Sequence, residues 1–176
     1  MLIAETPLPG VFVVEPSPIE DHRGHFARVW CRTELGDAGL TRDWEQANVQ
    51  FSPRPGTLRG MHYQRPPHDE VKLVRCTRGA VFDVAVDLRT DSPTYRRWHG
   101  AELTASNYRT MWVPEGCAHG FVTLEPDSEV LYMTSKPFAA DHAWGIRYDD
   151  PAIGIEWPVG VSVISERDAN WPLLVS

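Results

Sequence analysis

Two short segments of the sequence, 58–72 and 114–121, contain side chains that could take a proton from a carbon atom. The first segment holds Arg59, His62 and Lys72, and the second holds His119, with a glycine close to each histidine. Histidine titrates near neutral pH and can therefore act as a general base. A nearby arginine or lysine could stabilise the anion that remains. These segments indicate proton transfer at carbon, provided that the fold brings them together.

The residues around His62 predict a β-strand over 57–64. Side chains alternate along a strand, so His62 would share its face with Gly60 and Gln64, and Gly60 would leave room there for a ligand. Arg59 is out of phase and would point to the opposite face unless Gly60 allows a bulge. The alternatives are a hydrogen-bonded core histidine and an arginine that is only a surface charge.

Three further polar residues lie among apolar neighbours on predicted strand faces: Lys72, Asp83 and Tyr132. Inside a pocket, Lys72 could stabilise an enolate oxygen, whereas at a sheet edge it would be a solvated charge. An inward Asp83 would need a partner, so we expect this supporting carboxylate to orient a cation. Tyr132 has the ordinary alternative of a core tyrosine whose hydroxyl is hydrogen-bonded.

A metal site is not predicted. Histidines that bind iron, manganese or nickel on small β-barrels stand two residues apart, with a glutamate and a distant third histidine, but Gln64 stands two residues after His62. His62 and His119 without a third ligand make a poor site. We therefore expect neither a metal nor another cofactor. A metal-dependent oxygenase or isomerase is the alternative that metal analysis would exclude.

The composition excludes several classes of protein. The chain has 176 residues, of which 42% are hydrophobic and 23% charged, and its net charge is −7. A nucleic-acid binder would need a basic face, and no apolar run has the length of a membrane span. No signal peptide is recognisable, and Cys31, Cys76 and Cys117 have no paired spacing. We expect a cytoplasmic protein that binds neither nucleic acid nor membrane.

Short β-rich segments between turn residues predict one all-β domain over 1–176, a sandwich or small barrel of about ten strands. One of them, 81–88, shows a period of two, with Phe82, Val84, Val86 and Leu88 on one face and Val81, Asp83, Ala85 and Asp87 on the other. A short helix is predicted at 33–38 and a helical turn at 166–170. The predicted strands are 11–14, 25–30, 48–52, 57–64, 71–78, 81–88, 98–103, 109–113, 119–123, 129–135 and 153–156.

Motifs spread along the chain resemble the dTDP-4-dehydrorhamnose 3,5-epimerase family. The motifs are residues 21–26, Asn48, and residues 58–64, 72–75, 82–89, 92–95, 113–121, 149–151, 157–158 and 165–168. The resemblance implies a cupin-type jelly-roll barrel with a few short peripheral helices and no metal. It also implies an isomerase that inverts C3 and C5 of dTDP-4-dehydro-6-deoxy-D-glucose, giving dTDP-4-dehydro-L-rhamnose through an enolate.

The resemblance also implies roles for individual residues. His62 matches the base, Asp168 the carboxylate that pairs with it, Tyr132 the acid on the opposite face, and Lys72 the cation at C4. Family members form homodimers that exchange N-terminal strands. The implied substrate contacts are Arg59 and His119 near the sugar and diphosphate, Gln46 and Asn48 on the nucleotide side, Phe138 against the thymine, and Arg23 and Phe26 in the neighbouring subunit's pocket.

Two positions depart from the family pattern. Arg28 and Ala143 stand where many members carry glutamate, and the bulky Trp144 follows Ala143. These changes leave a different nucleotide or sugar open. A mono-epimerase acting at C3 or C5 only also stays open, as does a sugar-nucleotide-binding protein without catalysis. Such a binding protein would not require a base and an acid on opposite faces of a ligand.

Overall fold

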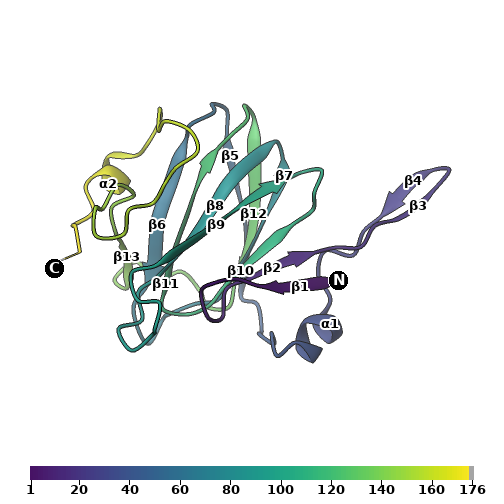
Figure 1. Cartoon of the computed structure of the whole chain (residues 1–176), viewed down its shortest axis with the longest axis horizontal. Coiled ribbons are helices and arrows are strands. Elements are labelled where there is room, and N and C mark those ends of the chain that lie inside the picture. Colours follow the sequence, from purple (N-terminus) through teal and green to yellow (C-terminus); the bar gives the residue numbers. More distant parts are fainter. Residues whose placement is uncertain (175–176) are drawn as a thin grey trace.

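The computed structural model describes residues 1–174, and within them two antiparallel sheets face each other as a cupin-type jelly roll (Figure 1). One sheet has the order β1 (Leu2–Glu5), β2 (Phe12–Glu15), β10 (Thr110–Val113), β7 (Lys72–Arg78), β12 (Ser128–Thr134) and β5 (Gln46–Ser52). The other has the order β13 (Ala143–Gly145), β6 (Leu58–Gln64), β11 (Cys117–Thr123), β8 (Ala80–Asp87) and β9 (Trp98–Thr104). This confirms the predicted fold class.

Strand β8 carries buried side chains on both of its faces. Val81 and Ala85 belong to the cluster between the two sheets, whereas Val84 and Val86 point outward. The outward cluster is covered by apolar residues of the C-terminal part, among them Ile146 and residues 153–157. Because each face buries its own apolar set, a register slip would expose one of them to water, and the register is therefore strongly specified.

Some predicted elements differ from the observed ones. The predicted strand 153–156 is wrong, because Ile153 and Ile155 pack on the outside of the barrel without joining a sheet. The predicted strand 25–30 is reduced to β4 (Gly24–Phe26), which pairs with β3 (Ile19–Asp21). Strands β1, β3 and β13 were not predicted. The two predicted helical segments correspond to α1 (Arg32–Asp37) and α2 (Glu166–Ala169).

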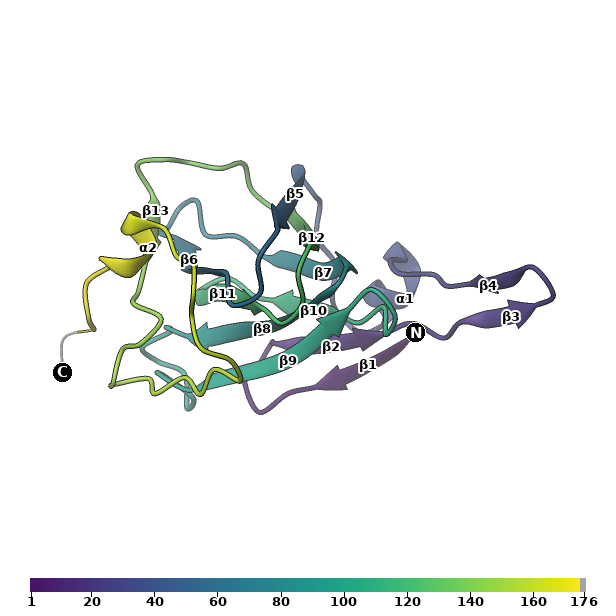
Figure 2. The same ribbon diagram turned by 90° about the horizontal axis from the view of Figure 1, so that it is seen from above.

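The hairpin β3–β4 projects away from the barrel (Figure 2). Its residues are exposed along both strands, including the large apolar side chains Ile19 and Phe26. Within residues 1–174, no helix is long and apolar enough to cross a membrane.

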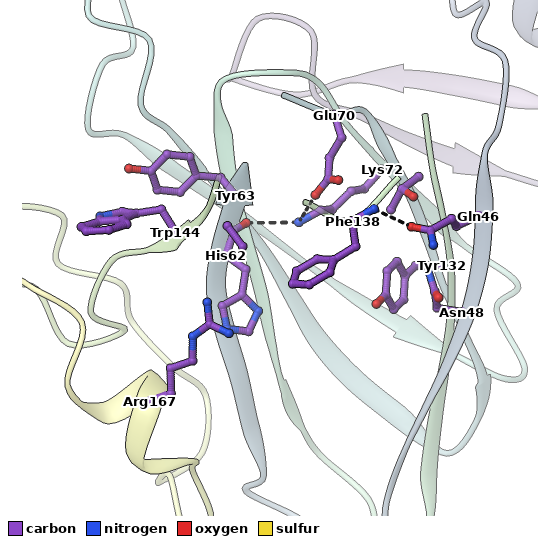
Figure 3. Close-up of a pocket in the computed structure, with 12 residues that line it drawn as sticks. Gln46, Asn48, His62, Tyr63, Glu70, Lys72, Tyr132, Phe138, Trp144 and Arg167 are labelled. Atoms are coloured by element: carbon purple, nitrogen blue, oxygen red, sulfur yellow. Dashed lines mark hydrogen bonds and ion pairs between the residues drawn. The ribbon is translucent and has the colours of Figure 1, made fainter. Parts of the chain in front are cut away.

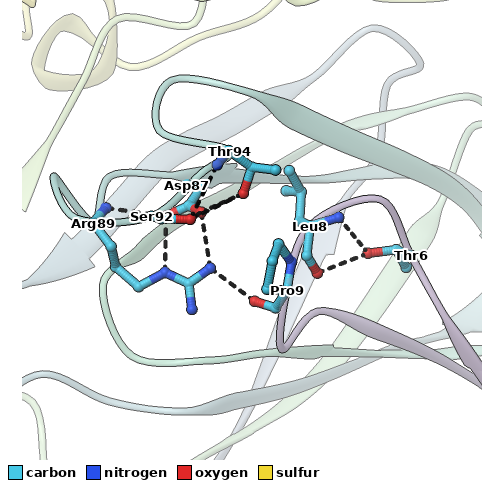
Figure 4. A network of polar contacts seen from close by, with 7 residues as sticks. All are labelled: Thr6, Leu8, Pro9, Asp87, Arg89, Ser92 and Thr94. Carbon is cyan, nitrogen blue, oxygen red and sulfur yellow. Dashed lines mark hydrogen bonds and ion pairs between the residues drawn. The ribbon is translucent and has the colours of Figure 1, made fainter.

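A buried carboxylate joins the end of β8 to the turn between β1 and β2 (Figure 4). Asp87 is fully buried, and its two oxygens accept hydrogen bonds from Arg89, Ser92 and Thr94 at 2.5–3.0 Å. Arg89 also donates to the carbonyl of Pro9 at 2.7 Å. Burial alone would raise the pKa of Asp87, but these hydrogen bonds outweigh burial and lower the pKa to about 2.

We expect Asp87→Asn to lower the free energy of unfolding by about 2 kcal/mol at pH 7, because the folded carboxyl titrates well below the ~3.9 of an unfolded aspartate. A depressed pKa stabilises the fold above the unfolded value, and this contribution is lost as pH falls from about 4 to 2. The difference between variant and wild type should therefore narrow over that range in urea titrations.

The control is Asp91→Asn, which removes the same charge from an exposed position in the following turn. An equal loss of stability in both variants, or a difference that does not depend on pH, would show that Asp87 does not act through its ionised hydrogen bonds.

Candidate active site

A cavity of about 430 Å³ opens between the two sheets (Figure 3). His62 enters it from β6 of the five-stranded sheet, and Lys72 and Tyr132 enter from β7 and β12 of the six-stranded sheet. A smaller cavity, also lined by these three residues, continues toward Arg59 and His119. The strands therefore bring the predicted proton-transfer residues together. The main cavity is lined by Gln46, Asn48, His62, Tyr63, Glu70, Lys72, Tyr132, Thr134, Phe138, Ala143, Trp144 and Arg167.

His62 is paired with a carboxylate from the C-terminal helix. Its Nε2 lies 2.7 Å from Oδ1 of Asp168, which is buried in α2. The hydroxyl of Ser165 caps this helix by accepting the Asp168 N–H at 3.1 Å, so the carboxylate is held in place. An ionised Asp168 accepts the hydrogen on Nε2 and leaves the lone pair of the neutral ring on Nδ1, as general-base chemistry requires.

The charge state of Asp168 follows from its surroundings. Burial raises the pKa of the Asp168 carboxyl, but the hydrogen bond with His62 and that from the Gly60 N–H outweigh it, so the pKa lies below its usual range. Asp168 is therefore ionised at neutral pH. Its carboxylate fixes the orientation of the imidazole through the contact at 2.7 Å.

A bulge in β6 explains how Arg59 and His62 reach the same cavity. His62 lies opposite His119 in β11, and Arg59 lies opposite Phe121, so three steps along β6 match two along β11. The extra residue reverses the alternation between Arg59 and His62, which is the condition for both to be functional. Both side chains line the smaller cavity.

The bulge also corrects the interpretation of Gly60. A Cβ atom at Gly60 would lie 2.7 Å from the Cα of Gly120, and the φ of Gly60 is +149°. The missing side chain makes room for the neighbouring strand rather than for a ligand. The prediction that Gly60 opens ligand space beside the imidazole is therefore wrong, because the prediction assumed regular alternation.

Contacts fix the position of Lys72, and the surroundings of Tyr132 set its pKa. The Nζ atom of Lys72 donates to the carbonyl of His62 and lies 3.2 Å from Glu70, with the side chain almost completely buried. Burial raises the pKa of Tyr132 above its usual value, the negative charge of Glu70 raises it further, and Arg59 lowers it. Tyr132 therefore keeps its proton at neutral pH and can act as a proton donor.

His119 has its own buried carboxylate. Its Nε2 lies 2.8 Å from Oδ1 of Asp83, a residue that is completely buried on β8. Asp83 thus orients a histidine, whereas the sequence predicted that it would orient one of the cations Arg59 or Lys72. Arg59 is held instead by the hydroxyl of Ser52 at 3.2 Å and the carbonyl of Phe51 at 3.1 Å.

The predicted nucleotide-side residues fall into two groups. Gln46, Asn48 and Phe138 line the main cavity, and Gln46 Oε1 accepts the Phe138 N–H at 2.8 Å (Figure 3). Arg23 and Phe26 lie on the β3–β4 hairpin and line neither this cavity nor its extension toward His119. Arg23 forms an exposed ion pair with Asp21 at 2.6 Å. One chain therefore assembles only the first group at the cavity.

The two departures from the family pattern occupy different places. Arg28 lies near the hairpin and pairs with Glu34 at 2.9 Å. Ala143 lines the main cavity from β13, next to Trp144, whose ring lies 3.8 Å beneath the guanidinium of Arg65. A cation above an aromatic face is attracted by the ring quadrupole. Trp144 itself lines the main cavity beside Ala143.

Sequence reasoning did not identify four residues that line the main cavity, namely Tyr63, Glu70, Thr134 and Arg167. Arg167 precedes Asp168 in α2, and its guanidinium lies 4.9 Å from the Trp171 ring. Arg167 could have been predicted from its place next to Asp168. A helix that places Asp168 against His62 also brings the neighbouring residue to the main cavity.

Comparisons with known proteins agree with this site. Residues 5–176 match the sequence profile of the dTDP-4-dehydrorhamnose 3,5-epimerase family. The chain is 46% identical over 169 residues to such an epimerase from Sinorhizobium fredii, covering 93% of this chain and 85% of the relative. A crystal structure of the Bacillus anthracis epimerase with TDP and pyrophosphate bound has a TM-score of 0.95 and 39% identity, covering 98% and 99% of the two chains.

A related structure is a 3′-monoepimerase from Streptomyces bikiniensis in complex with dTDP-quinovose, with a TM-score of 0.88, 32% identity, and coverage of 97% and 86%. The fold and these similarities place the chain in the class of isomerases built on a cupin-type jelly roll. The chain belongs to the dTDP-4-dehydrorhamnose 3,5-epimerase family.

We expect Gly60→Ala to destabilise the fold and reduce any activity at this site, because a Cβ would collide with Gly120 and disturb the bulge between Arg59 and His62. Thermal unfolding followed by circular dichroism would measure the effect. Gly160→Ala is the control, since a Cβ there meets no atom within 4 Å. Similar melting temperatures for the two variants would contradict the assigned role of Gly60.

Proposed function

We propose that this protein is a 3,5-epimerase that converts dTDP-4-dehydro-6-deoxy-D-glucose to dTDP-4-dehydro-L-rhamnose. The observation that carries the proposal is the arrangement of the cavity. The His62–Asp168 pair comes from one sheet and its covering helix, whereas Tyr132 comes from the facing sheet. A base and an acid on facing walls can remove a proton from one side of a carbon and return one to the other.

The proposed chemistry uses only side chains of the cavity. Nδ1 of His62 takes the proton from C3 or C5, and the C–H electrons move into the C4 carbonyl to form an enolate. Lys72 donates a hydrogen bond to the enolate oxygen and stabilises its charge. The Tyr132 hydroxyl then gives its proton to the opposite face of the carbon, and the centre is inverted. Exchange with solvent returns His62 and Tyr132 to their starting states.

Further residues support binding of the nucleotide and sugar. We assign Arg59 and the Asp83-oriented His119 to the sugar and diphosphate, because both line the inner extension of the cavity. Gln46 and Asn48 contact the nucleotide, and the exposed ring of Phe138 stacks on the thymine at the cavity mouth. The relative of 46% identity is named a 3,5-epimerase, which favours inversion at both centres over the mono-epimerase alternative.

We further propose that the protein works in the cytoplasm as a homodimer in which N-terminal strands are exchanged. The β3–β4 hairpin projects from the barrel with Ile19 and Phe26 exposed, which is unfavourable unless another surface covers them (Figure 2). In such a dimer, Arg23 and Phe26 would complete the partner's cavity. Cys31, Cys76 and Cys117 are free thiols, as suits a reducing compartment.

Proton NMR in D2O with dTDP-4-keto-6-deoxyglucose tests the reaction. We expect deuterium to enter both C3 and C5, and a coupled reductase to trap the L-sugar. Exchange at one carbon only would show a mono-epimerase. No exchange at either carbon would contradict the proposed reaction and favour a protein that only binds nucleotide sugars.

In the same assay, His62→Ala and Tyr132→Phe should slow turnover at least ~100-fold, as expected for the loss of a general base or acid. Calorimetry should find dTDP-sugar binding largely intact in both variants, because these groups act on the transition state. An affinity that falls as steeply as the rate would contradict these roles.

Mixed dimers test the exchanged hairpin. We expect the double variant Arg23→Ala, Phe26→Ala and the single variant His62→Ala to be nearly inactive alone. After mixing at equal concentrations, half of the dimers should be mixed and contain one complete site, restoring about a quarter of the wild-type activity. If no activity returns although size-exclusion chromatography and mass spectrometry show mixed dimers, the hairpin does not act on the partner's cavity.

A further inference from the structure

Glu70 places a largely buried carboxylate inside the same cavity. Its side chain is 9% exposed and lines the cavity together with Lys72 and Tyr132 (Figure 3). A buried carboxylate is costly unless other groups satisfy it. Glu70 has two such partners: Lys72 at 3.2 Å from one oxygen and Nε2 of Gln64 at 2.7 Å from the other. These contacts fix both carboxylate oxygens.

The contact limits how Lys72 can be used. A lysine ammonium has three N–H donors. Two acceptors already lie at 3.2 Å from Nζ, the Glu70 carboxylate and the carbonyl of His62. One of these N–H groups donates to the carbonyl of His62, and the Glu70 carboxylate attracts the ammonium as its ion-pair partner, so the position of Nζ is fixed while N–H groups remain for a ligand. An unpaired ammonium on a flexible four-carbon stem would have no such fixed position.

Gln64 connects this pair to the mouth of the cavity. It is buried on β6, and besides Glu70 its Nε2 lies within hydrogen-bond distance of the carbonyls of His68 and Pro137, at 2.9 and 3.2 Å. Its Oε1 accepts the Ala139 N–H at 2.6 Å. The segment between Pro137 and Ala139 carries Phe138. Hydrogen bonds thus run from this segment through Gln64 to Glu70, and the ion pair between Glu70 and Lys72 connects them to the ammonium.

We propose that Glu70 is a positioning residue for the epimerisation: it holds the Lys72 ammonium so that an N–H of Nζ meets the C4 oxygen, while Gln64 fixes Glu70 to the segment that carries Phe138. The inference rests on the proposed function. Glu70 itself neither gives nor takes a proton in the reaction. Its charge offsets part of the charge on Lys72, so its contribution is orientation rather than added electrostatic stabilisation.

The test compares Glu70→Ala and Glu70→Gln in the deuterium-exchange and turnover assays. Glu70→Ala removes the acceptor, and we expect kcat to fall about 10- to 100-fold, less than the loss typical of deleting an oxyanion donor, with KM and dTDP affinity within about twofold of wild type. Glu70→Gln keeps an acceptor oxygen for Lys72 and should recover part of the rate. Asp69→Ala removes the neighbouring carboxylate, which does not line the cavity, and should behave as wild type.

The outcomes separate the inference from the proposed function. If the wild-type protein exchanges no substrate hydrogen, the proposed function itself fails. If the wild type exchanges and Glu70→Ala keeps a wild-type kcat, only the role of Glu70 fails. A rise in KM that matches a loss of dTDP affinity would assign Glu70 to binding, and a Glu70→Gln variant no faster than Glu70→Ala would assign its effect to charge. Either result would overturn the positioning role, and melting temperatures show which variants remain folded.

Discussion

The close approach of Gly60 to Gly120 is the constraint on which the rest of the site depends. With no side chain on either residue, β6 and β11 can touch at the bulge, and an extra residue fits into β6. The bulge turns Arg59 and His62 toward the same cavity and directs the Gly60 N–H to Asp168. The bulge in β6 thus sets the direction of the Arg59 and His62 side chains and of the hydrogen bond from the Gly60 N–H to Asp168.

The two sheets contribute different parts of the proposed chemistry. The five-stranded sheet supplies the proposed base His62 and the His119–Asp83 pair, and the six-stranded sheet supplies Lys72 and Tyr132. Because apolar clusters between and outside the sheets fix their registers, the distance between the walls is set by the core. A sugar ring bound between them would meet preorganised groups on both faces, which is the condition for inversion at carbon.

Carboxylates paired with nitrogen-containing side chains recur at the site. Asp168 and Asp83 are buried beside His62 and His119, and the largely buried side chain of Glu70 lies beside Lys72. A carboxylate buried without a partner would be costly, so each one needs its nitrogen partner. The contact in turn fixes the direction of the partner side chain. Three carboxylates thus fix the orientation of three side-chain nitrogens that are proposed to be functional, in a chain of net negative charge that is proposed to bind a diphosphate.

The sequence by itself determined the strand-rich fold class and the strand positions of Lys72 and Tyr132 among apolar neighbours, because alternation along a strand is a local property. The structure then placed both side chains in the cavity. The resemblance to a family added Asp168, which lies 106 residues from His62. Only the tertiary structure decided that Arg59 and His62 share a face, that Gly60 makes room for Gly120, that Asp83 serves His119, and that Glu70 holds Lys72. Each of these depends on contacts between distant segments, and a one-residue bulge reverses every face assigned by alternation beyond it.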